Sequence, residues 1–200
     1  EQHALLDKVE ASWQNQGALL EGIIDITRLD SGVITPKRHA IDVPVELGNL
    51  ASEYSEPVAE KAITLQCQFE PMRVNTDPLL LTRILRNVLT NAVKFTPQYG
   101  KIIFHTKLIK IGQAASLQIK VKDTGIGISS ADLPYIFDRF YQSDNALTRK
   151  EGGTGIGLAL TKELVHLMQG TININSELDK GSEFIIQLPY KKTESLGLKN

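Results

Sequence analysis

Four glycines lie within residues 152–157, immediately ahead of a stretch with helical periodicity that runs to residue 168. Such a loop can turn tightly, and at the start of a helix it leaves backbone N–H groups without intrahelical partners. Those groups favour an anion, and a phosphate chain is the natural ligand. A flexible hinge is the alternative interpretation of the same glycines.

The familiar nucleotide-binding motifs are absent from the sequence. No GxxxxGK[ST] pattern occurs, so the chain is not a P-loop protein. Neither glycine cluster shows GxGxxG between a strand and a helix, which argues against a Rossmann dinucleotide site. The HRD and DFG signatures of protein-serine kinases are also missing.

A second feature is the helix predicted over residues 77–94, because Asp77-Pro78 joins an acidic N-cap to a proline at the first helical position. Its apolar residues share one face: Leu81, Ile84, Leu85, Val88, Leu89, Ala92 and Val93. Asn87, Asn91 and Lys94 form a stripe on the other side. The stripe is either a solvated face or a functional one. Amide oxygens bind a hard cation and an ammonium binds phosphate, a combination that suits a magnesium–nucleotide complex.

Asp123-Thr124-Gly125-Ile126-Gly127 follows a predicted strand. The glycines allow a tight turn beside a ligand and the aspartate is a fixed acceptor, although an ordinary Asp-turn would use the same residues. Residues 136–141 group aromatic side chains around Arg139, and residues 142–151 are polar without periodicity. We expect the latter to be a lid that orders on ligand binding. Taken alone, aromatic residues of this kind belong more often to a core than to a cofactor site.

The remaining pattern mixes helices and hairpins. We expect helices over residues 1–30, 44–61 and 156–168, a strand over 63–69 with a short partner over 72–75, and hairpins formed by 101–109 with 116–122 and by 171–175 with 183–188. This order predicts an α+β fold, a two-layer α/β sandwich with helices on one face of a largely antiparallel sheet.

The N-terminal helix carries a coiled-coil-like seam with alternating spacings of three and four residues. The seam residues are Leu6, Val9, Trp13, Gln16, Leu20, Ile23, Thr27 and Asp30. We expect this helix to self-associate; the alternative is that it folds back on the rest of the chain. The predicted division is therefore an N-terminal helical region over residues 1–32, a main domain over 33–190 and a frayed tail over 191–200.

Composition excludes several classes of protein. A formal net charge of −1 argues against a nucleic-acid binder. The single cysteine, Cys67, excludes an internal disulfide and suits a reducing cytoplasm. The chain starts at Glu1 without a methionine and contains no apolar run of about 20 residues. We therefore expect this chain to be a cytoplasmic fragment of a longer parent protein. An inner-membrane anchor upstream of the fragment is compatible with the sequence.

Taken in order, the blocks resemble the histidine-kinase branch of the ATPase superfamily that also includes gyrase-type topoisomerases and mismatch-repair ATPases. Residues 87–96 look like the N box, 123–127 like the first glycine box, 137–140 like the F box and 153–157 like the second glycine box. The resemblance covers residues 20–190, and residues 19–32 are similar to the end of the second dimerisation helix. Residues 141–144 and 148–150 look most like hybrid kinases, which carry a fused receiver domain.

The resemblance implies a Bergerat-type site for ATP and Mg²⁺. It makes Asn91 the principal magnesium ligand with Asn87 beside it, Lys94 a phosphate contact and Asp123 the acceptor of the adenine amino group. Arg139 would stabilise the transferred phosphoryl group, so Asn87, Lys94 and Arg139 are the catalytic candidates. The cofactor-binding candidates are Asn91, Phe95, Asp123, Gly125, Gly127, Phe137, Gly153, Thr154, Gly155, Gly157 and Leu158.

The implied activity is that of a protein-histidine kinase of two-component signal transduction, acting on a histidine outside this fragment. The acceptor motif is absent, because His3, His39, His105 and His166 all lack its context.

Hydrolysing relatives have a glutamate where Asn87 stands, and an amide cannot be a general base. The implied partners are the kinase's dimerisation domain, a response-regulator receiver domain and a second copy of the chain. Gln142 departs from the family pattern, since many kinases have a second arginine there.

Two alternatives from other classes remain. A nucleotide-responsive binding module would order its lid around ATP without phosphoryl transfer, but it would not need Asn87, Asn91, Lys94 and Arg139 together. An ATP hydrolase or serine kinase on the same fold is disfavoured by the amide at Asn87 and by the dimerisation-type helix.

Overall fold

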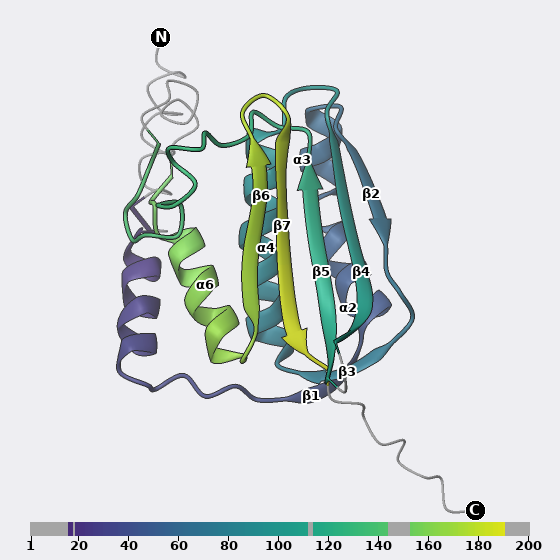
Figure 1. The fold of residues 1–200 in the computed structure, drawn as a ribbon, viewed down its shortest axis with the longest axis vertical. Coiled ribbons are helices and arrows are strands. Elements are labelled where there is room, and N and C mark those ends of the chain that lie inside the picture. Colours follow the sequence, from purple (N-terminus) through teal and green to yellow (C-terminus); the bar gives the residue numbers. More distant parts are fainter. Residues whose placement is uncertain (1–15, 18, 112–113, 144–152, 191–200) are drawn as a thin grey trace, which may run out of the picture.

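The computed structural model describes residues 16–17, 19–111, 114–143 and 153–190 (Figure 1). Residues 19–30 form the N-terminal helix. The other elements are β1 (His39–Asp42), α2 (Val43–Ser52), α3 (Ser55–Glu60), β2 (Thr64–Gln68), β3 (Arg73–Thr76), α4 (Pro78–Phe95), β4 (Lys101–Ile111), β5 (Ala114–Asp123), α6 (Gly157–Leu167), β6 (Thr171–Glu177) and β7 (Gly181–Pro189).

A five-stranded sheet in the order β2-β4-β5-β7-β6 forms one layer of the fold. Only the β2–β4 pairing is parallel within this sheet, and the other strands pair antiparallel with their neighbours. Helices α2, α4 and α6 cover one face and leave the other open (Figure 1). The two-layer α/β sandwich expected from the sequence is confirmed.

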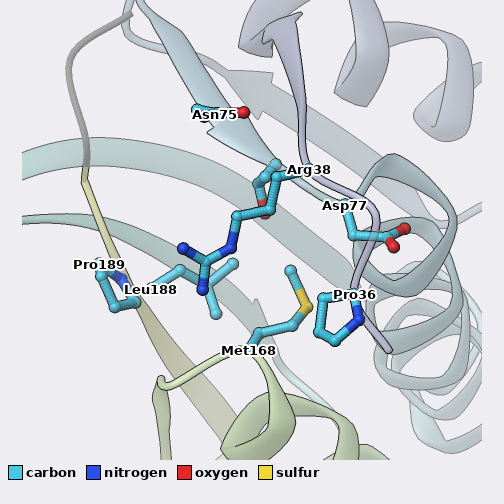
Figure 2. Close-up of a pocket in the computed structure, with 8 residues that line it drawn as sticks. Pro36, Arg38, Asn75, Asp77, Met168, Leu188 and Pro189 are labelled. Atoms are coloured by element: carbon cyan, nitrogen blue, oxygen red, sulfur yellow. The ribbon is translucent and has the colours of Figure 1, made fainter. Parts of the chain in front are cut away.

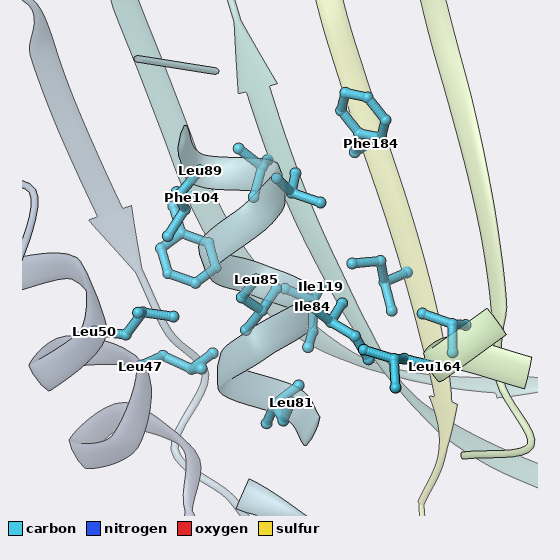
Figure 3. Packing of buried hydrophobic residues seen from close by; sticks show 14 of the residues in the cluster. Leu47, Leu50, Leu81, Ile84, Leu85, Leu89, Phe104, Ile119, Leu164 and Phe184 are labelled. Carbon is cyan, nitrogen blue, oxygen red and sulfur yellow. The ribbon is translucent and has the colours of Figure 1, made fainter. Parts of the chain in front are cut away.

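Helix α4 lies at the centre of the core because its apolar face meets the sheet on one side and helix α2 on the other. In Figure 3, Leu81, Ile84 and Leu85 lie between Leu47 of α2 and Ile119 of β5. These five side chains have at most 1% of their surface exposed. Burying each contributes roughly 1.5–3 kcal/mol, so this layer fixes the position of the helix that also carries the asparagine stripe.

The start of α4 follows the expected capping pattern. Asp77 Oδ1 accepts a hydrogen bond from Leu80 N at 3.0 Å, and Pro78 is the first helical residue. At the other end, Lys61 Nζ donates to the carbonyl oxygens of Val93 and Lys94 at 2.9 and 2.8 Å. The side chains of Asp77 and Lys61 therefore provide hydrogen-bond partners for backbone groups that the helix itself leaves unpaired at its two ends.

The N-terminal helix packs on the main domain through one face. Asp25 and Ile26 are buried, and Asp25 forms an ion pair with Arg83 of α4. A Cβ on Gly22 would lie 2.8 Å from Ile156 Cγ2, so this position keeps the helix close to the loop before α6. Leu20 and other apolar residues on the opposite face are exposed. The predicted seam positions Leu6, Val9 and Trp13 lie outside the described residues.

Two expectations about the elements were wrong. The helix predicted over residues 44–61 is two helices, α2 and α3. Pro57 has no N–H to donate to the carbonyl of Glu53, so the helix breaks at residues 53–54 and restarts with Pro57 in the first turn of α3. The strand over residues 72–75 does not pair with the strand over 63–69. It forms β3 and pairs with β1, which the sequence analysis did not predict.

Among the described residues, no helix has the length and apolar character needed to cross a membrane.

Candidate nucleotide site

A cavity of about 610 Å³ opens beside α4, between the loop after β5 and the loop before α6. Its volume lies in the range of small-molecule sites. The residues that line it are Asn87, Thr90, Asn91, Ala92, Lys94, Phe95, Asp123, Ile126, Gly127, Ile128, Ser129, Asp132, Ile136, Tyr141, Gln142, Ser143, Gly153, Thr154, Gly155, Gly157, Leu158, Leu178, Ser182 and Phe184. Four separate stretches of the sequence, residues 87–95, 123–143, 153–158 and 178–184, thus share one hollow.

The asparagine stripe of α4 faces this cavity. Asn87 Nδ2 donates to Thr161 Oγ1 of α6 at 2.7 Å, which leaves the amide oxygen as the group available to a ligand. A Cβ on Gly157 would lie 2.4 Å from that oxygen, so the glycine allows α6 to approach α4 closely. Asn91 and Lys94 line the same wall, and Lys94 Nζ lies 4.8 Å from the centre of the Phe95 ring.

Thr161 is a site residue that the sequence analysis missed. It is buried on α6, with 1% of its surface exposed, and its hydroxyl orients Asn87 from 74 residues further along the chain. No local pattern in the sequence marks such a contact, because a threonine in an amphipathic helix reads as ordinary packing.

Asp123 lies at the end of β5 with 4% of its surface exposed. Its Oδ1 accepts hydrogen bonds from Gly125 N at 2.8 Å and Ser182 N at 3.2 Å. Oδ2 is therefore the oxygen available to a ligand. Burial raises the pKa of Asp123 above the ordinary aspartate value, and the two backbone donors oppose that rise without cancelling it.

Glycines permit the close approach of the loops around Asp123. Gly127 has a φ of +66°, and a Cβ there would lie 1.9 Å from Glu177 O. A Cβ on Gly125 would lie 2.6 Å from Phe95 O and 2.7 Å from Asp123 Oδ1. Gly125 does not line the cavity, but its N–H orients Asp123 and its missing side chain lets the loop close on α4.

Asp132 is a second residue that the sequence analysis missed. Its carboxylate accepts hydrogen bonds from Tyr141 Oη at 2.6 Å, Ser143 Oγ at 2.7 Å and Ser129 Oγ at 2.9 Å. The Ser129 hydroxyl also accepts from Asp132 N at 3.1 Å. The Ser-x-x-Asp spacing is a capping-box signal and marks this pair in the sequence; the contacts with Tyr141 and Ser143 have no local signal.

Two predicted site residues lie away from the cavity wall. Arg139 donates to Asp30 Oδ1 and Oδ2 at 2.8 and 2.9 Å, so its guanidinium meets the end of the N-terminal helix. The hydrogen bonds from Arg139 lower the pKa of the Asp30 carboxyl. Phe137 packs against the hydrophobic core, and Lys162 Nζ lies 5.8 Å from the centre of its ring. The other predicted site residues, apart from Gly125, line the cavity.

A smaller hollow near β1 and the end of α6 does not compete with this site. Its volume is about 10 Å³, which is room for a single water molecule. Figure 2 shows the Arg38 side chain reaching toward Leu188 and Met168, and Arg38 donates to Gln169 Oε1 at 3.0 Å. Asp77 accepts from Lys37 N at 2.6 Å at the same place. The hollow is a gap between packed elements.

The protein family described as "Histidine kinase-, DNA gyrase B-, and HSP90-like ATPase" matches residues 76–192. That stretch contains α4, both glycine loops and the whole cavity wall. The chain belongs to this ATPase family. The expected resemblance to its sensor histidine kinases is also confirmed, because curated relatives with such names match nearly the whole chain.

The relatives of this ATPase domain are much longer proteins. This chain is 36% identical over 182 residues to the autoinducer 2 sensor kinase/phosphatase LuxQ of Vibrio vulnificus strain CMCP6, with 88% of this chain and 21% of the relative covered. It is 30% identical over 191 residues to the sensor histidine kinase RcsC of Escherichia coli K12, with 92% and 20% covered. The domain therefore spans about a fifth of the length of these relatives.

A solved structure has the same arrangement. Full-length ShkA in complex with AMPPNP superposes with a TM-score of 0.82 at 26% sequence identity, and the match covers 97% of this chain and 40% of that one. Because the superposition extends over nearly the whole chain, it includes the N-terminal helix as well as the ATPase domain.

Proposed function

We propose that this ATPase domain is the catalytic domain of a protein-histidine kinase, which transfers the γ-phosphoryl group of ATP to a histidine on a dimerisation domain outside the chain. One observation carries the proposal: a single cavity holds Asp123, the Asn87–Asn91–Lys94 stripe and the glycine loop over residues 153–157. An acceptor for adenine, amide oxygens for a cation and N–H groups for phosphates are the three groups that Mg-ATP requires.

In this proposal Asp123 Oδ2 accepts a hydrogen bond from the adenine amino group, which guanine lacks at that position. Lys94 and the backbone N–H groups of the loop over residues 153–157 hold the phosphates. The bond between the γ-phosphorus and the oxygen shared with the β-phosphate breaks, ADP leaves, and a new bond joins phosphorus to the acceptor imidazole nitrogen. The contribution of this chain is to position the reactants and stabilise charge.

The residues fit a magnesium ion that arrives with the nucleotide. Among the described residues no cluster of three or more His, Cys, Asp or Glu side chains forms a metal site, so the protein alone does not supply a cage. Asn87 and Asn91 offer neutral amide oxygens, and Mg²⁺ keeps phosphate oxygens and waters as its other ligands. The bound ion would neutralise phosphate charge, while Thr161 keeps the Asn87 oxygen turned to the cavity.

We also propose the setting of this domain. Its parent is a sensor kinase of hybrid type, working at the cytoplasmic side of an inner membrane, with a receiver domain as the later phosphoryl acceptor. The long relatives named sensor kinases support this setting.

The decisive experiment combines binding and transfer. Isothermal titration with ADP and Mg²⁺ should show binding by the wild-type chain, and Asn91→Ala should weaken it at least about tenfold, which corresponds to about 1.4 kcal/mol. With γ-labelled ATP, label should appear on an added chain that contains the acceptor helix and not on this chain. Binding without any transfer would instead favour the nucleotide-responsive module, and no binding would exclude both.

A further inference from the structure

Asp132 joins two stretches of the cavity wall that are separate in sequence. It follows Ser129, which donates to Asp132 Oδ2 at 2.9 Å, and it accepts from residues 9 and 11 positions further on. Tyr141 Oη lies 2.6 Å from Oδ1, and Ser143 Oγ lies 2.7 Å from Oδ2. Both carboxylate oxygens are thus engaged by hydroxyl groups, and the second stretch is fixed relative to the first.

The cluster lines the nucleotide cavity. Tyr141 is half-buried there, and its ring lies 5.7 Å, centre to centre, from the ring of Tyr135. Ile136 lines the wall nearby in sequence, so this side of the cavity combines apolar surface with a ring held by its hydroxyl. The hydrogen bond from Tyr141, followed by that from Ser143, lowers the pKa of Asp132, so the carboxylate is charged at neutral pH.

We propose that Asp132 is a positioning residue for nucleotide binding, which holds the Tyr141 ring against the adenosine half of the nucleotide. The inference rests on the proposed function. The phosphates belong near Lys94, whose charge is complementary, and near the backbone N–H groups of residues 153–157, whereas a carboxylate-held aromatic ring suits a base or sugar. Asp132 acts through Tyr141 and does not touch the reacting atoms.

Electrostatics alone predicts the opposite effect of removing this carboxylate. Asp132 carries a negative charge in the cavity that would hold a polyanion, so Asp132→Ala should tighten nucleotide binding if charge were its only influence. If the carboxylate positions the ring, the same substitution weakens binding, because part of the binding free energy must then be used to order the Tyr141 ring. The direction of the change therefore separates the two roles.

The test is titration calorimetry with Mg-ADP and a non-hydrolysable ATP analogue. We expect Asp132→Ala to raise Kd about tenfold and Tyr141→Phe to raise it about threefold for both nucleotides. The double variant should match Asp132→Ala alone, since the Tyr141–Asp132 hydrogen bond is already lost in Asp132→Ala, whereas independent effects would multiply to about thirtyfold. With the acceptor chain, Asp132→Ala should raise KM for ATP and leave kcat at saturating ATP nearly unchanged.

Asp138→Ala is the matched control. Asp138 is an exposed carboxylate of the same stretch that does not line the cavity, so its loss should leave Kd unchanged. If Asp132→Ala does not fold, Asp132→Asn carries the same cycle. Its amide oxygen still accepts one hydroxyl, so its Kd should exceed that of wild type by less than about tenfold. Unchanged or tighter binding by the Asp132 variants, or multiplicative effects with Tyr141→Phe, overturns the inference while the proposed function stands. A wild-type chain that binds no nucleotide overturns both.

Discussion

The carboxylate of Asp123 opposes the stability of the folded chain. It is buried, and burial raises its pKa, so the native state holds its proton more tightly than the unfolded state does. A group whose pKa is raised on folding contributes stability at low pH, and this contribution is lost as the pH rises through the pKa of the folded state. At neutral pH the charged side chain is therefore retained at a cost in stability, as expected of a residue kept for binding.

The first prediction follows for Asp123→Asn. The amide oxygen can still accept from Gly125 N and Ser182 N, but Nδ2–H would replace the oxygen proposed to meet the adenine amino group. We expect Kd for ADP to rise about tenfold to a hundredfold, because two donors then face each other. The nucleotide-free variant should be at least as stable as wild type at neutral pH.

Urea unfolding at pH values between about 4 and 8 checks the second half of this prediction, because this range includes the ordinary aspartate pKa and the values above it. Wild type should lose stability relative to Asp123→Asn as the pH rises above the ordinary aspartate range. A variant that binds ADP as tightly as wild type would remove Asp123 from the base pocket.

At the scale of elements, α4 joins the core to the site. Leu85 has no exposed surface and packs in the layer shown in Figure 3, while Asn87, two residues later, faces the cavity. Because one rigid helix carries both faces, the position of the stripe depends on how well the apolar face is packed. A loss of packing should therefore reduce nucleotide affinity as well as stability.

We accordingly predict that Leu85→Ala lowers the free energy of unfolding by about 2–5 kcal/mol, the range for a buried leucine replaced by alanine. Leu79→Ala is the matched control, since Leu79 lies in the same helix with 79% of its surface exposed. It should change stability by less than about 0.5 kcal/mol. Urea unfolding measures both, and equal losses in the two variants would contradict the central place of α4 in the core.

Local signals explain what the sequence could predict. The Asp77-Pro78 cap, the apolar face of α4 and the two hairpins all depend on residues within one element or its neighbour. Pro57 is also a local signal, because a proline interrupts helical hydrogen bonding and marks the break between α2 and α3. Strand β1 pairs with β3 across some 30 residues, and nothing in either short segment specifies that partner.

The candidate site divides in the same way. The glycine loops and the asparagine stripe mark themselves by composition and spacing, and they line the cavity. Thr161 and the Asp30–Arg139 pair depend on contacts between residues 74 and 109 positions apart. The contacts of Asp132 with Tyr141 and Ser143 span only 9 and 11 positions, but they cross an irregular loop with no periodic pattern. Each residue is ordinary in its own segment, so its role becomes visible only when the fold brings its partner near.

At the scale of the whole molecule, two ion pairs among the described residues connect the N-terminal helix to the ATPase domain, and their surroundings differ. The Asp25 side chain is 11% exposed and its partner Arg83 41% exposed. The Asp30 and Arg139 side chains are 54% and 42% exposed, so water and salt screen that pair almost fully. The inner pair should therefore stabilise the docked helix, whereas the outer pair should mainly determine where the Arg139 guanidinium rests.

We predict that Asp25→Ala accelerates amide hydrogen exchange in residues 19–30 about fivefold to thirtyfold. This equals about 1–2 kcal/mol, below the 3–5 kcal/mol of a fully buried pair because Arg83 keeps contact with solvent. Asp30→Ala removes the same functional group from the same helix and should leave these exchange rates nearly unchanged, even at low salt. Equal acceleration by the two variants would mean that the exposed pair holds the helix in place. Arg139 would then be a structural residue of this junction and could not leave Asp30 for a phosphoryl group without releasing the helix.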